Sequence, residues 1–337
     1  MEGPWVHSAM YKNFFGLRST PFNVNPDPRF LYLTQHAKEA LACLTYGIQS
    51  RKGFIVLSGE VGTGKTTLLN KIQEWLQRQN VRTAFIFNPR LEVQEFLEFT
   101  LTDFGVPDVT PGSSKSQLLM KLNNWLLERF RAGETAVLIV DEAQNLSEEM
   151  LEEIRLLTNL ETSSEKLLQI VLAGQPELDV KLRQPQLRQL RQRVTLRSRT
   201  YALTAAETRE YIQQRLHVAG SNGATIFTPE ALEAVHQYAR GVPRVINLIC
   251  EHSLISAFAE QQRQITPQVV HAVAEDFELT TRHDAPPAAD APAASVLGVE
   301  SDLDLATALK ALNTMEKLSR RLREVEAAAP KKGVSAQ

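Results

Sequence analysis

Between residues 35 and 203, short apolar runs alternate with longer segments whose apolar residues recur every three or four positions. The unbroken apolar runs predict strands that are buried on both faces, at 54–57, 136–140 and 168–173. Weaker strand patterns lie at 83–88 and 194–196. The segments with a helical period lie at 35–50, 66–79, 93–104 and 116–131. Strands that alternate with helices predict a doubly wound, parallel α/β sheet over residues 35–203.

After residue 203 the strand pattern stops and four helical patterns follow one another. They lie at 205–219, 229–239, 245–260 and 267–277, and Pro or Thr-Pro opens several of them. We therefore expect a small helical lid domain over residues 204–280.

Both ends of the chain differ from this pattern. Residues 1–34 are rich in aromatic residues and proline, so we expect a segment without regular helix or strand that packs on the core. The alternative is that its flat rings form a wall for an adenine ring. Residues 281–300 are rich in Ala and Pro and predict a linker, followed by an amphipathic helix over 301–329 and a disordered tail over 330–337.

Composition narrows the class of protein. A hydrophobic content of 43% can fill a sizeable core, and a net charge of −2 excludes a polybasic nucleic-acid binder by composition alone. Two distant cysteines and scattered histidines predict no metal cluster. No run of about 18 apolar residues is present, and the N-terminus lacks the apolar region of a secretory signal. We therefore expect a cytoplasmic protein without a transmembrane segment.

The first predicted strand leads into a glycine-rich turn with the spacing G-x-x-x-x-G-K-[ST]. Such a turn points successive backbone N–H groups at a phosphate, and the following helix adds the positive end of its dipole. We expect Lys65 to contact the β- and γ-phosphates of ATP and the Thr66 hydroxyl to bind Mg²⁺. The predicted nucleotide-binding residues are Gly59, Glu60, Val61, Gly62, Thr63, Gly64, Lys65, Thr66 and Thr67.

Two carboxylates, Asp141 and Glu142, follow the apolar strand at 136–140. Asp141 at the strand's end is placed to join Thr66 in holding Mg²⁺, and Glu142 is placed to polarise the attacking water. A pair of carboxylates at this position favours hydrolysis over a nucleotide switch. The next strand ends before Gln175, which we expect beside the γ-phosphate, where it would sense the loss of that group.

Residues 181–199 contain seven Lys or Arg and no Asp or Glu, whereas residues 147–165 carry six Glu. One basic and one acidic face on a single domain would suit head-to-tail assembly. In such an assembly Arg193 or Arg191 would act as an arginine finger on the neighbour's ATP. Arg244 opens a helix of the predicted lid, and we expect lid movement to carry it toward the γ-phosphate.

These motifs, in this order, resemble the AAA+ ATPases. The fuller pattern resembles the secretion-pathway protein A (ExeA-type) group and the exosortase-associated ATPases, over about residues 10 to 280. The residues that carry the resemblance include Tyr11, Phe14-Phe15-Gly16-Leu17, Pro21-Phe22, Gly59 to Thr66, Asp141-Glu142-Ala143-Gln144, Gly174-Gln175-Pro176-Glu177-Leu178, Leu190-Arg191-Gln192-Arg193 and Gly241-Val242-Pro243-Arg244. The resemblance implies that Gln175 is sensor 1, Arg193 the finger and Arg244 sensor 2.

The long ExeA-type members continue into a transmembrane helix and a peptidoglycan-binding part, and neither follows here. We therefore expect a soluble, Mg²⁺-dependent ATPase that acts as an oligomeric motor or switch in envelope secretion, assembly or export. We expect its C-terminal helix to dock on another subunit or on the export machinery, and so to place the protein at the inner membrane through a partner. The alternative is that this helix folds back on the lid. The alternative is a DNA-binding AAA+ regulator of the transposition type, with residues 181–199 facing the phosphates.

Overall fold

The structure is a computed structural model, and it describes residues 11–23, 27–87, 90–221, 223 and 225–279. The predicted linker, the C-terminal amphipathic helix over 301–329 and the tail lie outside the described residues, as do residues 1–10. The expectations for these segments remain predictions.

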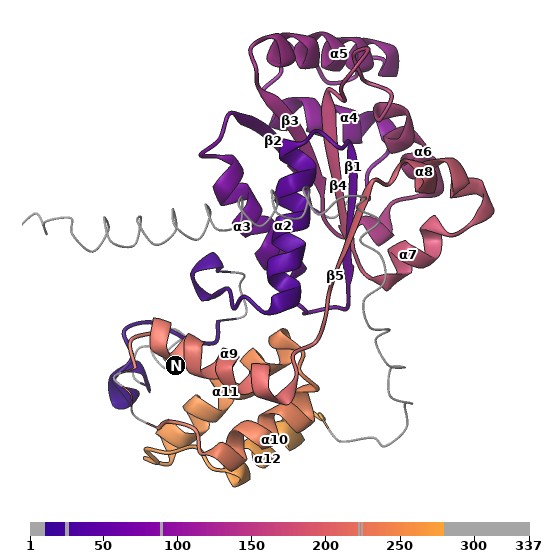
Figure 1. Ribbon diagram of the computed structural model, residues 1–337. Helices are drawn as coiled ribbons and strands as arrows, with labels where there is room; N and C mark the ends of the chain where they lie inside the picture. The colour runs from indigo at the N-terminus through magenta and orange to yellow at the C-terminus, as the bar shows by residue number, and fades with distance from the viewer. Residues whose placement is uncertain (1–10, 24–26, 88–89, 222, 224, 280–337) are drawn as a thin grey trace, which may run out of the picture.

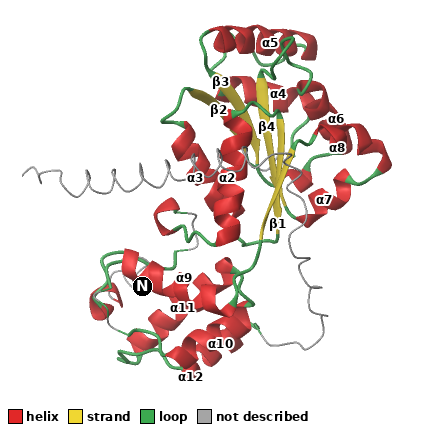
Figure 2. Ribbon diagram, in the orientation of Figure 1, coloured by secondary structure: helices red, strands yellow, loops and turns green. Residues whose placement is uncertain are grey.

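A five-stranded parallel sheet forms the centre of the larger part of the molecule (Figures 1 and 2). Its strands are β1 (Phe54–Gly59), β2 (Val81–Ile86), β3 (Thr135–Val140), β4 (Leu168–Gly174) and β5 (Leu196–Thr200). They pair in the order β2-β3-β4-β1-β5, every pair parallel. The carboxyl ends of β1, β3 and β4 therefore lie together at one edge of the sheet, which faces the helical part of the chain in Figure 1.

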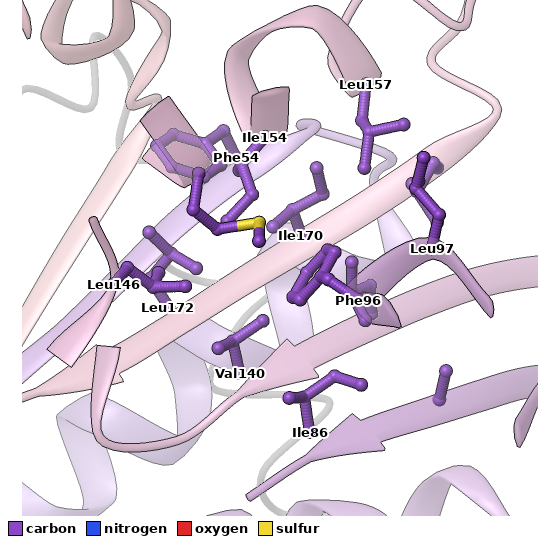
Figure 3. Packing of buried hydrophobic residues seen from close by; sticks show 14 of the residues in the cluster. Phe54, Ile86, Phe96, Leu97, Val140, Leu146, Ile154, Leu157, Ile170 and Leu172 are labelled. Carbon is purple, nitrogen blue, oxygen red and sulfur yellow. The ribbon is translucent and has the colours of Figure 1, made fainter. Parts of the chain in front are cut away.

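Helices cover both faces of this sheet, because successive residues of a buried strand point to opposite sides. Ile55 and Leu57 of β1 pack with α2 (Gln35–Gln49) and α3 (Lys65–Leu76). Phe54 and Val56 point the other way, into a cluster with the helices of the second layer (Figure 3). That layer contains α4 (Val93–Asp103), α5 (Lys115–Arg131), α6 (Glu148–Leu157), α7 (Pro176–Leu182) and α8 (Arg188–Arg193), with the 3-10 turns η2 (Ala143–Asn145) and η3 (Pro185–Leu187). The predicted doubly wound α/β sheet is confirmed.

The last strand was predicted in the wrong place. Residues 194–196 carry the apolar pattern, but β5 spans Leu196–Thr200 and Val194 caps the end of α8. β5 is an edge strand, and its sequence Leu-Arg-Ser-Arg-Thr includes side chains that reach solvent, so it has no apolar run. The short helices α6, α7 and α8 were not predicted, and residues 11–15 are helical where we expected no regular structure.

Four further helices form a separate bundle, which we call the lid: α9 (Ala205–Val218), α10 (Pro229–Ala239), α11 (Pro243–Ala259) and α12 (Pro267–Asp276). Short polar side chains cap the starts of α9 and α10, and a proline stands in the first turn of α10, α11 and α12. Thr204 accepts from the backbone N–H of Glu207, and Thr228 accepts from that of Ala231.

The N-terminal segment, which we expected to pack on the core, packs mainly on the lid, while Leu31 and Leu33 near its end pack against the α/β domain. Its large apolar side chains lie in one buried cluster with α9 to α12: Tyr11, Phe15, Leu17, Phe22 and Phe30. The buried Arg215 of α9 fixes the segment further by donating to the carbonyl of Pro21 at 2.6 Å. The bundle has an apolar surface that its own four helices leave uncovered, and this segment covers it.

No helix among the described residues is long and apolar enough to cross a membrane. Within the same residues no group of three or more His, Cys, Asp or Glu side chains could hold a metal ion.

Candidate nucleotide-binding site

The turn between β1 and α3 has the backbone shape of a phosphate-binding loop. Gly62 and Gly64 adopt φ angles of +77° and +97°, a region that side chains other than glycine rarely occupy. Gly64 also caps α3, and no side chain satisfies the first N–H groups of that helix. These N–H groups and the positive end of the helix dipole therefore point toward a place where an anion would be stabilised.

Lys65 is buried at the start of α3 and lies against the same turn. Its Nζ donates to the carbonyl oxygens of Gly59 and Glu60, at 2.7 and 2.9 Å. Burial lowers the pKa of Lys65, while the nearby carboxylates of Glu142 and Asp141 act in the opposite direction. The ammonium is held by neutral carbonyls, which a phosphate can replace as a stronger partner.

Thr66 and Asp141 come from different motifs and meet beside this lysine. The Thr66 hydroxyl donates to Oδ2 of Asp141 at 2.8 Å, and the backbone N–H of Glu142 donates to Oδ1 at 2.9 Å. Asp141 is 3% exposed, and burial is the main reason that its pKa is raised. The pair thus offers two oxygen ligands at one point, the ligand type that Mg²⁺ prefers.

Glu142 occupies a strained backbone position two residues after the end of β3. Its φ of 53° lies in the left-handed region, which costs energy for a residue with a side chain and is often found at functional sites. Oε2 of Glu142 accepts from Nε2 of Gln144 at 2.5 Å and from Nε2 of Gln175 at 3.2 Å. The structure therefore brings Gln175 into contact with Glu142, as the order of the strands requires.

A cavity of about 410 Å³ opens next to these groups. The phosphate-binding turn and Glu142 line it, together with Arg244 of α11 and with Phe30 and Tyr32 of the N-terminal segment. Arg244 is exposed, and its backbone N–H donates to the carbonyl of Gly62 at 3.2 Å. The N-terminal aromatic residues thus pack on the lid and line this cavity as well.

Arg193 and Arg191 lie on α8, away from the residues that line the cavity. Nη1 of Arg193 donates to the Thr158 hydroxyl at 2.9 Å, whereas the side chain of Arg191 is exposed and makes no hydrogen bond or ion pair among the described residues. Neither arginine lines the cavity of its own chain, so the finger role stays a prediction.

The charged segments do not form separate faces, which corrects our expectation. The acidic helix α6 and the basic helix α8 pack side by side (Figure 1). Gln186 next to α8 donates to Glu148 at 2.9 Å. The pKa of Glu152 is lowered mainly by its hydrogen bond to Arg155 of the same helix, and to a smaller degree by the charge of Arg193. The chain brings opposite charges together within one domain, so charge separation no longer argues for head-to-tail assembly.

Two residues of the site were not assigned a role from the sequence. The Thr200 hydroxyl at the end of β5 lies 2.7 Å from that of Thr63, and a Cβ on Gly59 would meet it at 2.0 Å. Gln144 contacts both Glu142 and the backbone of Gln175. Gln144 could have been suspected from its place two residues after Glu142, but Thr200 lies in a strand that the sequence pattern missed.

The strand order, the phosphate-binding turn, the carboxylates after β3 and the helical lid together define a P-loop ATPase of the AAA+ class. Comparisons with known proteins agree. Residues 48–182 match a family model described as an AAA domain. The chain is 45% identical over 256 residues to the General secretion pathway protein A of Aeromonas hydrophila, a match that covers 76% of this chain and 46% of that protein. The chain thus spans about half the length of this relative.

Two solved structures are similar in fold. The ORC2 protein of Aeropyrum pernix, solved as ADPNP–ADP complexes, gives a TM-score of 0.60 at 17% identity over 76% of this chain and 71% of that chain. The Cdc6p of Pyrobaculum aerophilum gives a TM-score of 0.60 at 19% identity over 74% of this chain and 70% of that chain. The chain therefore contains an AAA+ ATPase domain, and it resembles General secretion pathway protein A.

Proposed function

We propose that this protein binds ATP with Mg²⁺ in the cavity beside the turn after β1 and hydrolyses it there. The observation that carries the proposal is the meeting of three groups from two motifs: the Lys65 ammonium, the Thr66 hydroxyl and the Asp141 carboxylate. Phosphoryl transfer depends mostly on positioning and on stabilising charge, and these groups offer both.

The residues fit Mg²⁺ and ATP. Thr66 and Asp141 would hold the ion through their oxygens, and their 2.8 Å hydrogen bond shows that both already point to one place. Mg²⁺ at this point neutralises charge that develops on the β- and γ-phosphates. The phosphates would lie on the uncapped N–H groups at the start of α3, with Lys65 turning from the carbonyls of Gly59 and Glu60 toward them.

Glu142 would polarise the attacking water, because its carboxylate is only half-buried and borders the cavity. Gln175 would sense the γ-phosphate from its contact with Glu142, and Arg244 would reach the phosphates from the lid. Phe30 and Tyr32 also line the cavity and would provide the flat surfaces that an adenine ring requires.

For the cellular role, we propose an oligomeric motor or switch in envelope secretion or export. The support is the name of the relative from Aeromonas hydrophila, together with the predicted C-terminal helix as a docking element for a partner at the inner membrane. Arg193 or Arg191 would then complete the neighbouring site. Deleting residues 281–337 should leave ATP binding intact and weaken assembly or partner capture.

The DNA-binding alternative is less well supported, because the basic segment is largely engaged within the chain. Lys181 donates to the carbonyls of Gln144 and Leu146, and Arg197 and Arg199 both pair with the buried Asp179. A salt titration of duplex binding separates the two roles, since phosphate neutralisation gives a steep loss of affinity with salt.

The test of the enzymatic proposal is ATP turnover with and without Mg²⁺, in the wild type and in Glu142→Gln. We expect turnover only with the metal, and strong slowing in Glu142→Gln with nucleotide binding retained. Glu149→Gln is a matched control because Glu149 is exposed on α6. Full turnover in Glu142→Gln, or turnover with the metal removed by a chelator, would refute the mechanism.

A further inference from the structure

Gln144 bridges the two strand ends that carry the proposed chemistry. It lies in η2, two residues after Glu142, and its half-buried amide reaches across to the end of β4. Its Oε1 accepts the backbone N–H of Gln175 at 3.0 Å, and its Nε2 donates to Oε2 of Glu142 at 2.5 Å.

The chemistry of the neighbours fixes which way this amide points. A backbone N–H can only donate, so the amide oxygen of Gln144 must face Gln175. A carboxylate can only accept, so the amide nitrogen must face Glu142. The opposite orientation would place two donors together at one end and two acceptors together at the other. The two hydrogen bonds therefore both require the same orientation of the Gln144 amide.

The surrounding residues keep a place for this amide. A Cβ on Gly174, the last residue of β4, would come within 2.9 Å of Oε1 of Gln144. Lys181 of α7 holds the backbone from the other side, because its Nζ donates to the carbonyls of Gln144 and Leu146 at 2.8 and 2.7 Å. The absence of a side chain at Gly174 leaves room for the amide of Gln144, and Lys181 fixes the backbone from which that amide extends.

From this geometry we infer that Gln144 is a positioning residue for ATP hydrolysis: it holds Oε2 of Glu142 and thereby directs Oε1 of that carboxylate toward the attacking water. The inference rests on the proposed function. Nε2 of Gln175 shares the same carboxylate oxygen at 3.2 Å, so both glutamines restrain Glu142 through one atom. Gln144 itself does not line the cavity, and it acts only through Glu142.

The test is steady-state ATP turnover together with binding of a fluorescent non-hydrolysable ATP analogue, in Gln144→Met and in the control Gln77→Met. Methionine matches the length of glutamine but offers neither donor nor a strong acceptor. We expect kcat of Gln144→Met to fall about 10- to 100-fold, because the Glu142 carboxylate loses its orientation. The dissociation constant of the analogue should stay within about twofold, since no contact with the nucleotide is removed. Gln77 is exposed at the far end of α3, and its variant should match the wild type.

A second experiment separates positioning from general structural damage. In the Glu142→Gln background, Gln144→Met should cause no further loss of the residual turnover, because the residue acts only through the Glu142 carboxylate. If Gln144→Met does not fold, as judged by its thermal unfolding, Gly174→Ala serves instead, since its Cβ presses on the same amide and leaves Gln144 in place. Because that Cβ would also come within 2.9 Å of Cδ2 of Leu178, the variant is compared at equal thermal stability.

An unchanged kcat in Gln144→Met, or a weakening of analogue binding equal to the loss of kcat, would overturn the inference. An additional loss in the Glu142→Gln background would overturn it as well. Failure of the proposed function would look different, because wild type and Gln77→Met would then lack Mg²⁺-dependent turnover too.

Discussion

The backbone N–H of Arg244 donates a hydrogen bond of 3.2 Å to the carbonyl oxygen of Gly62, and this contact joins the lid to the phosphate-binding turn. A Cβ on Gly62 would come within 2.7 Å of Cβ of Arg244 and 3.1 Å of Cγ1 of Val242. Gly62 therefore has to be glycine for two reasons, its φ of +77° and the closeness of α11. If nucleotide binding moves the backbone of this turn, the start of α11 has to move with it, because the two are in direct contact.

The first prediction separates these two reasons. Gly62→Ala should lower stability by roughly 1–2 kcal/mol through the left-handed backbone and should also weaken ATP binding, because the new methyl group pushes α11 away. Gly105→Ala is the matched control, since Gly105 has a φ of +72° and no atom near its added Cβ. Isothermal titration with ATP and thermal unfolding measure both effects. Equal ATP affinity in the two variants would show that the lid contact does not matter for binding.

The second prediction concerns Lys65. Lys65→Met should abolish the rise in Tm that a non-hydrolysable ATP analogue gives in the wild type, because the phosphates lose their cation. A ligand at about 100 times its dissociation constant stabilises a folded protein by roughly 2.7 kcal/mol, which a thermal scan resolves easily. Lys71→Met on the same helix removes a lysine that pairs with Glu74 at 3.2 Å, and it should keep the rise. A preserved rise in Lys65→Met would place the nucleotide elsewhere.

The third prediction distinguishes Arg193 from Arg191. Because Arg193 donates to Thr158, Arg193→Ala should cost about 1 kcal/mol and lower Tm by about 2–4 °C. Arg191 has no such contact among the described residues, so Arg191→Ala should leave Tm unchanged. Equal Tm values in the two variants would contradict the structural role of Arg193.

The same two variants test whether the site is shared between subunits. If one arginine acts on a neighbour's nucleotide, wild-type specific activity should rise with protein concentration, and that arginine's variant should lose the rise. Mixing the affected variant with Glu142→Gln should then recover part of the activity. Turnover that is independent of concentration in the wild type would remove the arginine finger from the mechanism.

The fourth prediction concerns the attachment of the N-terminal segment to the lid. The Tyr11 hydroxyl donates to Oε1 of Glu251 at 2.7 Å, and Oε2 of Glu251 has no hydrogen-bond partner among the described residues. Burial raises the pKa of Glu251 above its ordinary value of 4.5, although Tyr11 and Arg215 act against this. A raised pKa means that ionisation costs the folded state, so stability is lost as pH rises from the unfolded pKa through the folded one.

Glu251→Gln keeps an acceptor for Tyr11 and cannot ionise. Relative to the wild type, its free energy of unfolding should therefore be larger, meaning greater stability, at about pH 7 than at about pH 4, as measured by denaturant unfolding. Glu233→Gln, at an exposed position on α10, should show no such difference. A constant offset between Glu251→Gln and the wild type across this range would mean that folding does not raise the pKa of Glu251.

The sequence alone determined the parts of the site that lie within one strand, turn and helix. The spacing from Gly59 to Thr66 fixes a phosphate-binding turn because the glycines and the helix start are neighbours along the chain. The apolar run before Asp141 likewise fixes its place at a strand end. The helices of the lid could be predicted because Thr and Pro mark their starts locally.

Only the tertiary structure decided which distant segments meet. The order β2-β3-β4-β1-β5 places the end of β4 beside the end of β3, and so brings Gln175 and Gln144 to Glu142. The packing of α6 against α8 turned two predicted faces into one mixed surface. The N-terminal aromatic residues packed on the lid because that bundle leaves apolar surface uncovered, a property of four helices together. Contacts of this kind join residues that are far apart in sequence, so no local spacing of residues encodes them. They depend on which surfaces the helices and strands still expose once each has formed.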